Sequence, residues 1–465
     1  MNWKHLLSAI VCFVSWNASS QTLDYYAELN QPASYGDARY NALGGSMTAM
    51  SGSFTALALN PAGAGFFRQD AFSMDMGIFS KRNTLDNQAV RGNTTTLNIN
   101  TLGFLGRDKE SGWNFFFTYN SDDLYRERIR DIRTNTGSMT TQWLERSEGT
   151  PPDYLPELGA YEDLLYQSYA TDYDPNSMSY YSSANLSDVD FNHTYFRKGM
   201  RNRWTFGGGT NLGNTFFYGA SISLVHSFET VEINHEETYN STTDLDRLIL
   251  TDYWNNNAIG LSGNLGVLYR PVQFLRFAAA LELPHIYSFS QDWESEIKAF
   301  RPSISASGTT AQGYGEAYMW TMMTAPKLRS GATLVMGRSA LFTVNHTLIP
   351  HDWSASISRN ERYLTDVVRN ELDAQHLWSA AGEWRSGVIT LRSGVAMSPS
   401  YREAFGDFWR FGCGAGIRID EMSINIGYSR MTQQQQYYPF SGDYVDPLLF
   451  QSMESMLNLG AVWKF

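Results

Sequence analysis

Histidines at metal-binding spacing, or histidines that could activate a nucleophile, would be the clearest sign of catalysis in this chain. The sequence has histidines but no such arrangement. No pair follows the His-x-x-x-His or His-Glu-x-x-His spacing that puts two imidazoles on one helix face. His351-Asp352 could serve a barrel protease and Asn234-His235-Glu236-Glu237 could bind a metal, but each stands alone in an expected loop or strand end. Gly-x-Ser-x-Gly and Gly-x-x-x-x-Gly-Lys are both missing. We therefore expect no catalytic residue, no enzyme activity and no cofactor. The histidines beyond residue 20 are His193, His226, His235, His285, His346, His351 and His376.

Two other features carry weak chemical signals. Asp172, Asp174, Asp188 and Asp190 could hold Ca²⁺, which prefers oxygen ligands, but a solvated acidic loop explains them more simply. Cys413 is the one cysteine beyond the first twenty residues and lies among glycines, so it is interpreted as a small wall residue. We expect neither a metal site nor an internal disulfide.

The composition favours a membrane barrel over a soluble domain. Aromatic residues make up 14% of the chain and charged residues 18%, and the mean hydropathy is only −0.34. An apolar band, aromatic girdles and a polar interior together give this balance. A secreted β-sandwich rich in tyrosine is the alternative. The net charge of −12, without a Lys/Arg run, excludes nucleic acid as a partner.

Both ends of the chain indicate export to an outer membrane. Residues 1–20 read as a signal peptide, because basic residues precede a short apolar run and small residues precede Gln21. The last ten residues alternate, with Leu457, Leu459 and Trp463 on one face. The final Phe465 is typical of the signal that the barrel assembly machinery recognises. We therefore predict a bacterial outer-membrane protein.

Period-two segments predict an all-β chain with fourteen antiparallel transmembrane strands. Short and long connections alternate between them, as in barrels with tight periplasmic turns and long outer loops. The barrel is expected to occupy 69–465, with a long extracellular insertion at about 121–201. The expected strands are 71–80, 94–107, 112–120, 202–212, 214–236, 252–270, 273–299, 312–337, 340–354, 370–385, 387–400, 407–419, 421–433 and 455–465.

The segment 21–68 does not read as a membrane strand. Its small apolar residues are interrupted by glycine and proline, which indicates short helices joined by tight turns. A piece of this size attached to a fourteen-stranded barrel has room to pack in the lumen. We therefore expect an N-terminal, partly helical hatch. The breakers are Gly44, Gly45, Gly52, Pro61 and Gly63.

This segment resembles the hatch of the FadL-type family of outer-membrane transporters for long-chain fatty acids and aromatic hydrocarbons. The resemblance is carried by Ala38-Arg39, Gly44-Gly45 and Asn60-Pro61-Ala62-Gly63. It implies passive, hatch-gated uptake of a small hydrophobic molecule, with sideways exit through a kink in the third strand. Residues 113–119, in the expected third strand, have no internal Gly or Pro, so either this chain departs from the family's kink or the expected strand boundaries are misplaced.

The resemblance also suggests ligand contacts, which have a simpler alternative. Phe54, Phe66 and Phe67 could meet the ligand, or they could only pack the hatch on the wall. The expected partners are a small hydrophobic ligand, outer-membrane lipid and lipopolysaccharide, and the expected state is a monomer. A general porin or structural barrel, a barrel enzyme, and a surface receptor that uses 121–201 remain alternative functions.

Overall fold

The computed structural model describes residues 25–85, 92–240, 244–359, 362–402, 405–440 and 444–465. The expected signal peptide, 1–20, lies outside these ranges. The main strands are β1 (Ala71–Leu85), β2 (Gly92–Arg107), β3 (Asn114–Thr136), β6 (Val189–Leu212), β7 (Phe216–Tyr239), β8 (Arg247–Val272), β9 (Leu275–Glu282), β10 (Ile286–Arg301), β11 (Ser305–Met323), β12 (Lys327–Met336), β13 (Ala340–Ile349), β14 (Ala355–Ser356), β15 (Gln375–Ser386), β16 (Ile389–Ser398), β17 (Phe408–Ile419), β18 (Met422–Tyr437) and β19 (Leu448–Lys464).

These strands form one closed antiparallel barrel. β1 pairs with β19 from Ala71 opposite Lys464 to Leu85 opposite Phe450, so the first and last strands close the sheet. In the described part of the chain, β9 with β10, β11 with β12, and β13 with β14 each form one interrupted strand, because each pair continues along shared neighbours. The barrel therefore has fourteen strands, which confirms the predicted fold class.

The exterior of the barrel is apolar and the interior is polar. On β1 the side chains of Phe72, Met74, Met76 and Ile78 are exposed, and the intervening Asp75 is buried. This alternation gives the wall a lipid-facing surface and a polar lumen. Among the described residues, no helix is long and apolar enough to cross a bilayer.

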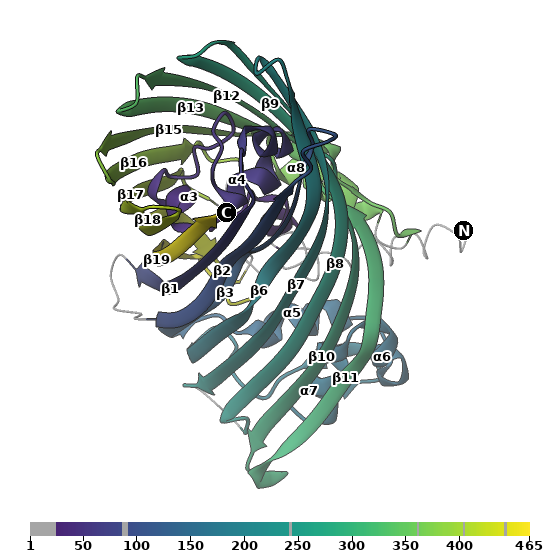
Figure 1. Ribbon diagram of the computed structural model, residues 1–465. Coiled ribbons are helices and arrows are strands. Elements are labelled where there is room, and N and C mark those ends of the chain that lie inside the picture. The colour runs from purple at the N-terminus through teal and green to yellow at the C-terminus, as the bar shows by residue number, and fades with distance from the viewer. Residues whose placement is uncertain (1–24, 86–91, 241–243, 360–361, 403–404, 441–443) are drawn as a thin grey trace.

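The wall is much taller on one side than on the other. β6, β7 and β8 have 24, 24 and 26 residues, whereas β15, β16 and β17 have 12, 10 and 12. Figure 1 shows the long strands extending past the rest of the barrel, at the end that carries α5, α6 and α7. The tall side therefore projects beyond the membrane on the side of the long connections.

The long insertion is shorter than predicted. β3 continues to Thr136 and β6 begins at Val189, so residues 137–188, here called the cap, replace the expected 121–201. The missed strand segments lie outside the apolar belt, where polar side chains occupy both faces and no apolar period appears. The cap and the smaller outer elements are α5 (Met139–Ser147), η2 (Pro152–Tyr154), α6 (Leu155–Leu158), α7 (Ala160–Gln167), β4 (Asp172–Asp174), β5 (Ser179–Tyr181), η3 (His351–Trp353) and α8 (Tyr363–Glu371).

Residues 25–68 fill the barrel as short helices, and this segment is called the hatch below. Residues 25–30 are helical, followed by α3 (Ala38–Ala42), α4 (Phe54–Leu59) and η1 (Pro61–Phe66). Figure 1 shows α3 and α4 inside the ring of strands. Asp37 caps α3 by accepting from the Tyr40 amide, and Ser53 caps α4 by accepting from the Ala56 amide.

Candidate functional site

A cavity of about 1020 Å³ lies between the hatch and the cap. Its floor is formed partly by Gly44 and Gly45 of the hatch, and its roof includes Trp143 and Tyr161 of the cap. The wall adds further aromatic side chains and several ion pairs to the lining. The space has the size of a small-molecule site, and its lining mixes aromatic with charged side chains.

The predicted hatch motif holds the hatch together and against the wall. The Asn60 side chain donates to the Thr48 carbonyl at 2.9 Å and accepts from the Ala62 amide at 3.1 Å. Pro61 begins η1, where its missing N–H costs nothing. Ala62 and Gly63 are buried in the same short helix. The motif therefore fixes the conformation of the hatch backbone around η1. A role of the motif in gating stays a prediction.

Gly44 and Gly45 lie where the hatch turns back toward the cavity. Their φ angles are +59° and +82°, a left-handed backbone that side chains rarely adopt. A Cβ on Gly44 would lie 3.0 Å from the backbone of Gly394 on β16. The left-handed backbone at both positions, and the close approach of Gly44 to β16, explain why two glycines occur here.

The three phenylalanines proposed as ligand contacts pack the hatch on the wall. Phe54 and Phe67 share a buried cluster with Leu105 and Phe116 of the wall. Phe66 stacks on Phe217 at a centroid distance of 3.9 Å. None of the three lines the cavity described above. This placement matches the packing alternative, and a role in ligand binding stays a prediction.

Glycines of the wall receive the backbone of the hatch, a feature that sequence reasoning missed. A Cβ on Gly219 would lie 2.6 Å from the Pro61 carbonyl, and a Cβ on Gly266 would overlap the Asn60 side chain. On the opposite wall, Gly412 and Gly427 make room in the same way for α3. The spacing of glycines inside expected strands was the available signal, because such glycines often mark a close backbone approach.

The wall has a gap between β2 and β3. The two strands pair only from Thr101 opposite Asn120 to Arg107 opposite Asn114. Beyond that point β3 pairs with β6 alone, and Asp122 bulges out of the register between Ser121 and Asp123. A bulge bends its strand, and this one needs neither Gly nor Pro. Residues 114–120 themselves keep a regular register, and the irregularity lies just beyond the expected end of the third strand at residue 120.

The N-terminal segment seals this gap from inside. The amides of Ser34 and Tyr35 donate to the Asp122 carbonyl at 2.8 and 3.1 Å. Tyr35 packs with Leu124 of β3 and Phe79 of β1 in one buried cluster. Burial, and then the nearby Glu454 carboxylate, raises the pKa of the Tyr35 hydroxyl, so it stays protonated and donates to Glu454 at 2.5 Å. Ser34 and Tyr35 of the hatch therefore contact β1, β3 and β19 through hydrogen bonds and apolar packing.

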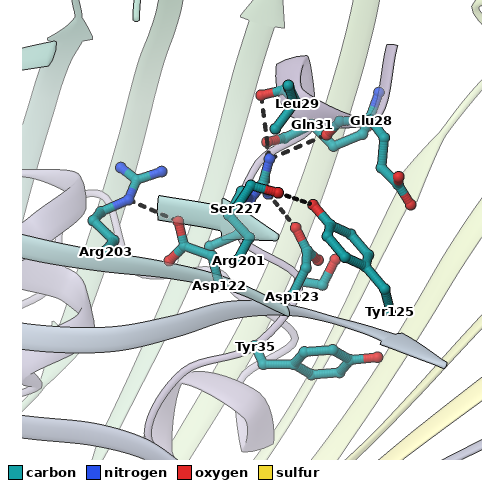
Figure 2. A network of polar contacts seen from close by, with 12 residues as sticks. Glu28, Leu29, Gln31, Tyr35, Asp122, Asp123, Tyr125, Arg201, Arg203 and Ser227 are labelled. Atoms are coloured by element: carbon teal, nitrogen blue, oxygen red, sulfur yellow. Dashed lines mark hydrogen bonds and ion pairs between the residues drawn. The ribbon is translucent and has the colours of Figure 1, made fainter. Parts of the chain in front are cut away.

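Buried arginines tie the same segment to the tall wall, as Figure 2 shows. Arg201 forms an ion pair with Asp123 and donates to the carbonyls of Glu28 and Leu29 at 3.1 and 3.2 Å. Arg203 forms an ion pair with Asp122 at 2.7 Å. The arginines therefore couple the position of the hatch to the bulge beside the gap.

Replacing Arg201 by alanine is expected to destabilise the folded protein by about 3–5 kcal/mol, since Asp123 would be left buried without its partner. Chemical unfolding in detergent micelles measures the change. Lys198 on the same strand is the control. Its pair with Glu232 is nearly half-exposed, so Lys198→Ala should cost about 1 kcal/mol or less. An equal effect of both changes would contradict a tethering role for Arg201.

The weak chemical candidates are distributed over unrelated contacts. His351 donates or accepts in a contact with Gln375 at 3.4 Å, and burial lowers its pKa to about 4. Asp172 forms an ion pair with Arg301 at 2.8 Å. His235 contacts Glu237 at 3.2 Å. Among the residues that the structure describes, no three His, Cys, Asp or Glu side chains are grouped to hold a metal ion.

Comparisons with solved structures identify the architecture. No family model and no curated protein matches the sequence. The toluene transporter TodX of P. putida aligns over 94% of this chain and 99% of its own, with 13% identity and a TM-score of 0.53. The chain therefore has the FadL/TodX fold. A Pseudomonas aeruginosa FadL homologue aligns over 92% of this chain and 98% of its own, with 10% identity and a TM-score of 0.58.

A third FadL/TodX structure gives the same result. The Ralstonia pickettii toluene transporter TbuX aligns over 94% of this chain and 99% of its own, with 11% identity and a TM-score of 0.53. The FadL/TodX fold and the apolar exterior make this chain a bacterial outer-membrane β-barrel. At these identities the likeness concerns the fold alone.

Proposed function

We propose that the chain is a passive channel for small hydrophobic molecules in the outer membrane. The ligand would enter the cavity under the cap and leave sideways through the gap between β2 and β3. The observation that carries the proposal is the interrupted pairing of these strands beside a filled lumen. The names of the similar structures, which are toluene transporters and a FadL homologue, support the same ligand class.

The cavity reaches the gap on its inner side, which supports this route. Its lining includes Leu124 and Ile129 of β3, both beyond the bulge, and Lys81 of β1. An apolar ligand gains about 0.8 kcal/mol for each CH₂ removed from water. Passage from the cavity directly into the bilayer keeps that gain, whereas release into periplasmic water forfeits it. A lateral route therefore needs no energy source other than the gradient.

The hatch supports a gate and argues against a general pore. Tyr35 and Leu124 close the gap, so movement of residues near Tyr35 is the smallest change that opens it. The hatch fills the lumen below the cavity with buried side chains, which argues against a wide aqueous channel.

Reconstitution of the mature chain in liposomes tests the proposal. Uptake of a fluorescent long-chain fatty acid is measured together with permeation of a small sugar in the same vesicles. We expect faster fatty-acid uptake than in protein-free liposomes and no sugar leak. Sugar leak without faster fatty-acid uptake would overturn the proposal for this ligand and favour a general porin.

A further inference from the structure

Four arginines form an exposed cationic surface on the outside of the barrel, on either side of the gap between β2 and β3. We call this surface the arginine rim: Arg82 on β1, Arg430 on β18, and Arg128 and Arg130 on β3. The first two share one contact surface. Arg430 approaches the Met453 sulfur at 2.8 Å, and Met453 pairs across the sheet with Arg82. Met453 is on β19, the strand between the two that carry Arg82 and Arg430.

No carboxylate neutralises the arginine rim. Within the described ranges, none of its four arginines makes an ion pair, although Arg130 donates to the Asn192 amide oxygen at 3.3 Å. Other exterior cations are paired, such as Arg247 with Glu236 at 3.2 Å. Exposed acidic residues lie on other strands, such as Asp292 and Glu294 on β10 and Glu232 on β7. In a chain of net charge −12, the arginine rim is therefore a local basic surface.

The arginine rim lies at the outer boundary of the apolar belt. On β1 the outward side chains are apolar from Phe72 to Ile78, then Ser80, and then Arg82. From Phe72 to Arg82 the strand rises about 33 Å, which is about 25 Å along the membrane normal at a tilt of about 40°. That is about the height of the apolar band of such barrels. On β18 the sequence is similar, because Ile426 and Tyr428 precede Arg430.

We propose that the arginine rim binds the phosphate groups of a phosphorylated glycolipid, lipopolysaccharide, in the outer leaflet. The guanidinium group is suited to phosphate because it offers two parallel N–H donors. Basic clusters at the membrane boundary attract anionic lipid head groups in this way. The proposal concerns the outside of the barrel and does not rest on the proposed transport. Arg128 and Arg130 are on β3, which borders the gap, whereas β2 lies between the gap and Arg82 on β1.

Binding of purified lipid A to the full-length mature protein in neutral detergent tests the proposal by native mass spectrometry. The double variant Arg82→Gln/Arg430→Gln is compared with Arg247→Gln, which changes an exterior arginine on the acidic side. We expect the double variant to bind lipid A about thirtyfold more weakly. Arg247→Gln should bind like the parent. Equal lipid A binding by the parent and the double variant would overturn the proposal.

Two further arms identify what is bound. Lipid A with both phosphates removed should bind the parent about as weakly as lipid A binds the double variant. Unchanged binding of this dephosphorylated lipid would overturn a phosphate site. Inorganic phosphate at millimolar concentration should not displace lipid A, and complete displacement would indicate a site for the free anion instead. Heat-modifiable migration on gels checks that each variant is folded, because folded barrels resist unfolding in cold detergent.

Discussion

Replacing Gly427 by leucine is expected to displace the hatch and to raise the permeation of small sugars through the barrel by about tenfold or more. Gly427 faces the lumen on β18, and a Cβ there would overlap the Ala38 carbonyl and lie 2.9–3.0 Å from other Ala38 backbone atoms. Backbone cannot turn aside as a flexible side chain does, so α3 has to move. Sugar entry into liposomes and single-channel conductance in planar bilayers both report the loss of the plug.

The control is a glycine of another barrel strand, where an added Cβ would meet no atom of the hatch. Gly382 on β15 has only the Leu341 carbonyl within reach, at 3.8 Å from the Cβ position. Gly382→Leu should therefore leave sugar permeation at the level of the parent, while adding the same side chain to a strand. Equal and low permeation in both variants would contradict the view that wall glycines hold the hatch in place.

Much of the fold follows from the sequence because the membrane imposes a simple rule on it. The apolar outward residues from Leu457 to Trp463 predicted a closing strand, and β19 pairs with β1 along this segment. The same rule fails outside the bilayer. β3 carries Asp123, Glu127 and Arg128 in a region where both faces are polar, so its length could not be inferred from an apolar period.

The candidate site was predictable only in part, for a different reason. Asn60 and Gly44 belong to two short motifs of the hatch. The Asn60 side chain bonds to the nearby hatch backbone, and Gly44 allows a left-handed turn. Local features of this kind can be recognised in a sequence. The partners of Gly219 and Gly427 are more than a hundred residues away, and no single sequence reveals such contacts. The bulge at Asp122 depends on pairing with β6, which is equally remote.

The bulge beside the gap is held by a network of buried charges in the wall. Arg203 joins Asp122 to Glu282 on β9, with ion-pair distances of 2.7 and 3.5 Å. Glu282 in turn binds Lys327 of β12 at 2.9 Å. A continuous set of buried charges thus runs from the bulge to the opposite wall. Such a network is costly to disrupt at one point, so the bulge is held firmly while the N-terminal segment beside it is the simpler part to release.

Deleting Asp122 is expected to close the wall and to abolish most of the uptake of a fluorescent long-chain fatty acid, with a reduction of about tenfold or more relative to the parent. The register between β3 and β6 shifts by this one residue, so its removal lets β3 continue straight along β6. A straight β3 can then pair with β2 beyond Asn120, where β2 now pairs only with β1. Uptake in liposomes measures the effect.

The matched variant is Asp122→Ala, which removes the ion pair with Arg203 but keeps the extra residue in the strand. It should lose stability because Arg203 loses one of its two carboxylate partners, yet it should retain most of the uptake. Loss of uptake in both variants would point to the charge and not to the shape of the wall. Full uptake by a folded deletion variant would exclude the gap as the exit, because the ligand would then be leaving by another route.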